Sequence, residues 1–93
     1  MKFTIIISQT AKNHVEKAYN YYESVQEAIG ERLLETLELQ YDKLKNTPQH
    51  YSFLSGKKDL RFLVVPQFPF IIIYQIKGDH VFIIDVHNTH QNS

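Results

Sequence analysis

The sequence has no cysteine and no tryptophan, and it has only three glycines and three prolines in 93 residues. A domain of this size can use disulfides when it works in an oxidising compartment. Their absence is consistent with a reducing one and predicts a cytoplasmic location. Ninety-three residues suit one small domain, so we expect a single domain over residues 1–93.

Long apolar runs are absent too. The N-terminal run over residues 3–7 is too short for the core of a signal peptide, and residues 9–13 are largely polar. Later runs at 62–65 and 68–74 are far shorter than a membrane span, and prolines interrupt this region. We therefore expect neither export nor a membrane partner.

An excess of charge of either sign is also missing, because ten Lys and Arg balance ten Asp and Glu. Proteins that bind nucleic acid through its phosphates usually carry a basic surplus, so the balance argues against binding of this kind. Four of the five histidines lie after residue 47, so the second half of the chain becomes basic if they are protonated.

The chain does have a large apolar content, at 43% of residues, with six Tyr and six Phe. Apolar residues recur at spacings of three and four from Ala11, which predicts a helix that ends near a turn at Gly30. A second helix is predicted from about Glu31 to Lys45, and Asn46-Thr47-Pro48 should end it. The apolar stripe of the second helix comprises Leu33, Leu37, Tyr41 and Leu44.

Four segments are typical of strands, and they lie at residues 2–8, 60–65, 70–77 and 81–87. The first is expected to be buried on both faces through its three consecutive isoleucines. Lys77-Gly78-Asp79 is typical of a tight hairpin turn. We predict a two-layer α+β fold in which an N-terminal strand and a helical hairpin precede an antiparallel three-stranded meander, with both helices on one side of the sheet.

Five segments resemble, in the same order, motifs of the RelE/ParE superfamily of bacterial toxins. They are 18–23 (AYNYYE), 30–35 (GERLLE), 44–48 (LKNTP), 61–74 (RFLV through FPFIIIY) and 85–87 (DVH). The resemblance covers nearly the whole chain. It implies a small antiparallel sheet with a helical hairpin, the first strand lying beside the last.

The resemblance also implies a growth-arresting toxin of a type II toxin–antitoxin system, often described as a plasmid stabilisation protein. RelE-like members cleave mRNA on the ribosome, whereas ParE-like members poison DNA gyrase. Both kinds are silenced by a cognate antitoxin, so a toxin–antitoxin hetero-oligomer is expected. The apolar strands favour an exposed sheet edge or groove that such a partner covers.

If the chain is a nuclease, the candidate catalytic residues are Arg61, Tyr74, His87 and His90. Cleavage through a 2′-OH needs a base, an acid and a group that stabilises the phosphorane. Arg61 can clamp a phosphate, and an imidazole at a strand end can transfer protons near neutral pH. Two of these residues also have a purely structural interpretation. For His87 it is a polar residue at the end of a strand. For Tyr74 it is packing in the core, which is the better interpretation.

For Arg61, the alternative to a catalytic role is an ion pair with Asp59 or Asp85.

The spacing of three between His87 and His90 also suits metal binding, but the sequence places no third ligand. We predict neither a metal nor a cofactor.

The C-terminal segment departs from the family pattern. The arginine expected in the motif H-x-x-R falls on His90, and the Asn-Pro that follows it becomes Gln91-Asn92. Together with the neutral charge, this favours a ParE-like toxin directed at a protein such as gyrase over a RelE-like ribosome-dependent mRNA endonuclease. A third alternative is a non-toxic relic that still binds antitoxin. Whether the chain is an enzyme stays open at this point.

Overall fold

A strand, a helical hairpin and a three-stranded meander follow one another in the computed structural model, which describes residues 2–57 and 59–90. The elements are β1 (Thr4–Ile7), α1 (Gln9–Val25), α2 (Ile29–Asn46), the short 3₁₀ helix η1 (Pro48–His50), β2 (Arg61–Val64), β3 (Phe70–Lys77) and β4 (His80–Asn88). The strand order is β1-β4-β3-β2, so the first strand lies beside the last and runs parallel to it. The predicted α+β architecture is confirmed.

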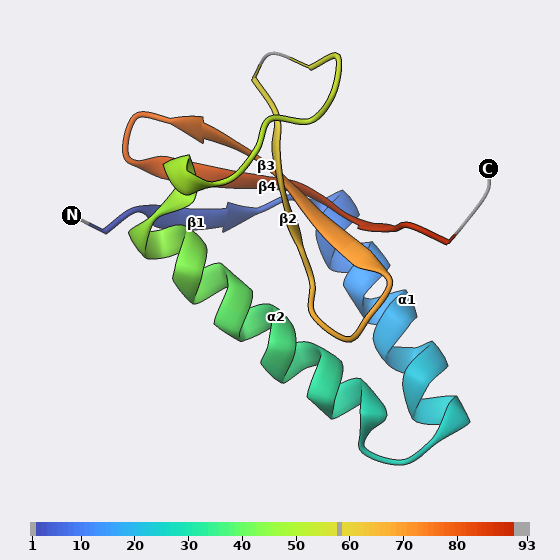
Figure 1. Ribbon diagram of the computed structural model, residues 1–93. Coiled ribbons are helices and arrows are strands. Elements are labelled where there is room, and N and C mark those ends of the chain that lie inside the picture. Colours follow the sequence, from blue (N-terminus) through green and yellow to red (C-terminus); the bar gives the residue numbers. More distant parts are fainter. Residues whose placement is uncertain (1, 58, 91–93) are drawn as a thin grey trace.

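Both helices pack on one face of the sheet, as Figure 1 shows for the antiparallel pair formed by α1 and α2. The predicted stripe of α2 is buried, and it meets side chains from β2, β3 and β4 in one core. The buried members of this core are Ala11, Leu33, Leu37, Tyr41, Leu44, Leu63, Val65, Phe70, Ile72, Tyr74, Val81, Ile83 and Val86. No helix in the described part of the chain is both long and apolar enough to cross a membrane.

The expectation that the first strand is buried on both faces is wrong. Ile5 and Ile7 pack against the core, but Ile6 between them is 40% exposed. The physical reason is that the helices form a layer on one side only, so alternate residues of β1 point away from them. The tight turn before β4 is as expected, and Gly78 adopts a φ of 60° in it.

Ser8 joins β1 to α1. Its hydroxyl accepts a hydrogen bond from the Ala11 amide at 3.0 Å, which caps the helix, and donates one to the Ile84 carbonyl at 2.7 Å. Its amide also donates to the Ile83 carbonyl. Because one residue holds the helix start against β4, α1 begins where β1 ends and continues along the C-terminal half of β4.

The connection between the helices depends on Glu23 of α1. Its carboxylate accepts hydrogen bonds from the amides of Gly30 at 2.8 Å and Glu31 at 3.3 Å, which are free donors in the first turn of α2. The residue with positive φ in the connection is Ala28 (74°), whereas Gly30 lies inside the helix. Gly30 is needed for space, because a Cβ there would lie 2.6 Å from Glu23 Cγ.

We expect Gly30→Ala to destabilise the protein by about 1–3 kcal/mol, because the new methyl group must displace Glu23 and Tyr19 from the start of α2. Helix propensity alone predicts that Gly30→Ala stabilises the protein, since Ala is the better helix former. Urea unfolding measures the difference. In the background of Glu23→Ala the same change should cost clearly less, and an equal cost in both backgrounds would contradict this explanation.

Candidate functional site

The four residues predicted from the sequence do not converge on one place. Arg61 on β2 pairs with Tyr74 on β3, which in turn pairs with Ile83 on β4. His87 lies four positions further along β4. At ~3.3 Å per residue and ~4.8 Å per strand, Arg61 and His87 are on the order of 16 Å apart. Arg61 also lies on the same side of the sheet as its partner Tyr74, whereas His87 lies on the opposite side of the sheet, at the end of β4 that borders α1.

Arg61 holds the loop that follows η1. Its Nη1 atom donates to the Tyr51 carbonyl at 2.7 Å and to the Gln49 carbonyl at 3.2 Å, and its guanidinium lies 4.0 Å from the centre of the Phe53 ring. The predicted ion pair with Asp59 or Asp85 is wrong, since the described residues show none. A planar guanidinium can donate hydrogen bonds to two carbonyl oxygens and stack on an aromatic ring at the same time, which explains these contacts of Arg61.

Tyr74 belongs to the core, as the better of its two interpretations predicted. It is fully buried, and its hydroxyl donates a hydrogen bond of 2.5 Å to the Pro48 carbonyl. Burial raises the pKa of its phenol to about 12. The hydroxyl therefore keeps its proton near neutral pH and ties β3 to the end of α2 through η1.

His87 is half exposed at the end of β4, next to the carboxylate of Asp85. Asp85 Oδ2 lies 4.0 Å from His87 Nδ1, and Asp85 Oδ1 lies 2.6 Å from Nδ1 of His14 on α1. His14 was not anticipated, because 71 positions separate it from Asp85 and nothing local in the sequence couples them. The register between β3 and β4 shifts at this point, because Ile73 pairs with Asp85 whereas Tyr74 pairs with Ile83. Ile84 is therefore the extra residue of a bulge in β4, directly before Asp85.

The His90 amide donates to the Asn88 side chain at 2.9 Å, and the residue is exposed. The altered segment Gln91-Asn92 lies outside the described residues. In the part of the chain that the structure describes, no group of three or more His, Cys, Asp or Glu side chains could hold a metal ion.

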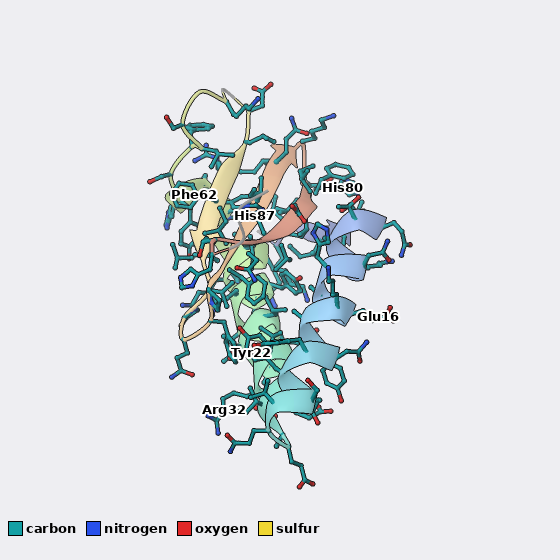
Figure 2. All side chains as sticks on the ribbon, turned by 90° about the vertical axis from the view of Figure 1, so that its right-hand side faces the viewer. Glu16, Tyr22, Arg32, Phe62, His80 and His87 are labelled. Carbon is teal, nitrogen blue, oxygen red and sulfur yellow. The ribbon has the colours of Figure 1, made fainter. Side chains whose placement is uncertain are left out.

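The outer face of the sheet, turned away from both helices, is apolar. Ile6 on β1 and Val64 on β2 are 40% and 60% exposed, and Ile84 at the bulge is 38% exposed. Between them lie partly buried side chains that point the same way, namely Phe62, Ile71, Ile73 and Phe82. Figure 2 shows Phe62, His80 and His87 at the sheet end of the molecule and Arg32 near the opposite end of the helical hairpin. We call the apolar surface formed by these residues the outer sheet face, and its members are Ile6, Phe62, Val64, Ile71, Ile73, Phe82 and Ile84.

The edge of the sheet at β2 is partly occupied by the loop before it. The Phe62 amide donates to the Ser52 carbonyl, and the Leu54 amide donates to the Leu60 carbonyl. The first bond uses a backbone amide of β2 and the second uses the carbonyl just before it, and an added strand would need both groups. The geometry thus offers an apolar surface for a protein partner, together with a small histidine–carboxylate group beside α1.

Comparison with known families identifies the family of this chain. The model of the ParE toxin of type II toxin–antitoxin system, parDE, matches residues 5–92. The chain belongs to the ParE toxin family. This ParE-family chain is also similar in structure to a chain of the chromosomal ParDE TA system from P. aeruginosa, with a TM-score of 0.83 and 15% identity. The match covers 96% of this chain and 98% of the other, and at that identity it shows a shared fold.

No match was found among curated protein sequences. The expected relationship to RelE/ParE toxins, made from motifs in the sequence, is confirmed on its ParE side.

We expect alkaline pH to destabilise the folded state between about pH 10 and 12. Burial raises the pKa of Tyr41 and of Tyr74 to about 12, so the folded state holds two protons that the unfolded state releases above its ordinary value of 10.0. The stabilisation is complete below pH 10 and is lost as pH rises, on the order of 2–3 kcal/mol for each phenol.

Urea unfolding at pH 9 and pH 11.5 measures this loss. Tyr74→Phe should remove about half of the pH dependence, and it should cost about 1–2 kcal/mol at neutral pH because the Pro48 carbonyl loses its donor. An unchanged pH dependence in both Tyr41→Phe and Tyr74→Phe would show that other groups cause the alkaline unfolding.

Proposed function

We propose that this ParE-family chain arrests growth by inhibiting a protein target such as DNA gyrase, and that a cognate antitoxin neutralises it by covering the outer sheet face. Membership of the ParE toxin family supports the toxin role. The outer sheet face supports a protein partner, because apolar area of this kind is removed from water when a second protein packs on it.

The exposure of the outer sheet face is the observation that carries the proposal. Large apolar side chains lie at both edges and at the bulge, with partly buried apolar neighbours between them. A partner that lays a helix or an extended segment across this surface gains hydrophobic energy at about 25 cal/mol per Å². The occupied edge at β2 favours binding across the face over the addition of a strand at that edge.

The arrangement of the candidate catalytic residues favours a target bound by contact over RNA cleavage. Arg61 holds backbone carbonyls, Tyr74 is buried, and His87 lies on the other face. General acid–base chemistry needs its groups within about 3 Å of the reacting atoms. The balance of ten basic and ten acidic residues also gives little electrostatic drive toward a ribosome.

The purified chain should inhibit supercoiling of relaxed plasmid by gyrase, and the antitoxin should restore it. His87→Ala should inhibit to the same extent as the unchanged chain, because the proposal gives this imidazole no catalytic role. Primer extension on translated mRNA should show no cleavage. Cleavage that the double variant Arg61→Ala, His87→Ala abolishes would support the RelE-like alternative, and harmless expression with retained antitoxin binding would support the relic.

Antitoxin binding should weaken at least tenfold in Val64→Lys, because a charge then lies within an apolar contact. Lysine suits an exposed edge strand, so the fold should survive. Leu39→Lys is a matched control, since Leu39 on α2 is 62% exposed and Val64 is 60% exposed. Calorimetric titration with antitoxin measures the affinity of both variants. A loss of affinity only in Leu39→Lys would show that the antitoxin binds the helical layer and not the outer sheet face.

A further inference from the structure

A pocket of about 420 Å³ lies between α1 and the C-terminal half of β4, away from Arg61 and from the core tyrosines. It has the size of a small-molecule site, for which a few hundred Å³ is usual. Ala18, Phe70 and Val86 supply its apolar part. Neither the family model nor the proposed toxin role gives this pocket a ligand.

Basic side chains surround one part of the pocket. His14 and Lys17 come from adjacent turns of α1, and His87 comes from β4. The described residues that line it include no carboxylate. Asp85 nearby lies 2.6 Å from Nδ1 of His14 and 4.0 Å from Nδ1 of His87, so the Nε2 atoms of the two rings and the Lys17 side chain are the groups left for a ligand. The pocket therefore suits an anion.

Aromatic rings form another part. Tyr21 is one helical turn beyond Lys17, and its ring is packed edge-on against Tyr22 at 5.1 Å between centroids. Tyr21 is 62% exposed, so it contributes little to the core and its face is open to a flat group. The Asn88 side chain adds an amide that can both donate and accept hydrogen bonds.

We propose that this pocket binds a free nucleoside monophosphate, with the phosphate between Lys17 and His87 and the base against Tyr21. Charge-assisted hydrogen bonds from cationic side chains are the usual means of holding a phosphate, and aromatic faces stack on bases of any sequence. A free mononucleotide fits better than a nucleic acid strand, because a strand needs a longer basic track and the chain has no basic surplus. The proposal does not depend on gyrase or antitoxin.

Titration of the purified chain with adenosine 5′-monophosphate tests it, with adenosine and inorganic phosphate as separate probes. Amide NMR shifts should change in residues 14–22 and 86–88, and the mononucleotide should bind at least tenfold more tightly than either fragment. A single-stranded oligoadenylate should bind no more tightly per chain. The absence of saturable mononucleotide binding, or much tighter binding of the oligonucleotide, would overturn the proposal.

Variants on the exposed surface of α1 separate the two halves of the ligand. Lys17→Gln should weaken mononucleotide binding about tenfold and leave adenosine binding unchanged, whereas Lys12→Gln, outside the pocket on the same helix, should change neither. Tyr21→Ser should weaken mononucleotide binding about tenfold, and Tyr21→Phe should retain it because the ring remains. Equal losses in Lys17→Gln and Lys12→Gln would show that the attraction is not local to the pocket.

Discussion

The fold depends on the two hydrogen bonds of the Ser8 hydroxyl. One caps α1 and the other holds the start of that helix to the Ile84 carbonyl, at the bulge of β4. This fixes the direction in which α1 leaves the sheet, and the helical hairpin returns from there over the core. It also brings His14 to Asp85 and encloses the pocket beside β4. A side chain without a hydroxyl at position 8 would leave both the helix amide and the bulge carbonyl without this partner.

A sheet covered on one face only has two different surfaces, and this protein uses them differently. The inner face supplies its stability through a core that includes the buried phenols of Tyr41 and Tyr74. The outer sheet face keeps apolar side chains in water, which costs free energy in the isolated chain and is relieved in a complex. In the proposed function, this division leaves the outer sheet face to a partner while the inner face holds the fold together.

The sequence predicted most of the architecture, because the periods of three to four and of two residues are local properties. The stripe from Leu33 to Leu44 and the turn at Gly78 were found in this way. That β1 lies beside β4 came only from the family resemblance, which implied an antiparallel sheet, whereas this one pair of strands is parallel. The contacts of His14 and Arg61 could not be predicted, because each depends on residues brought near by the whole fold. Gly30 was correctly placed near a turn, but the crowding by Glu23 that requires it is visible only in three dimensions.

The pairing of the first strand with the last has a consequence for synthesis. Thr4 to Ile7 align with His80 to Ile83, so β1 has no partner strand until nearly the whole chain has been made. Chains emerge from the ribosome N-terminus first, and contacts between distant segments form late. The helical hairpin can form early, but the completed sheet, and every surface that depends on it, must wait until β4 has been made. A growing chain therefore lacks the outer sheet face, so under the proposed function it cannot present that surface to a partner before β4 has joined the sheet.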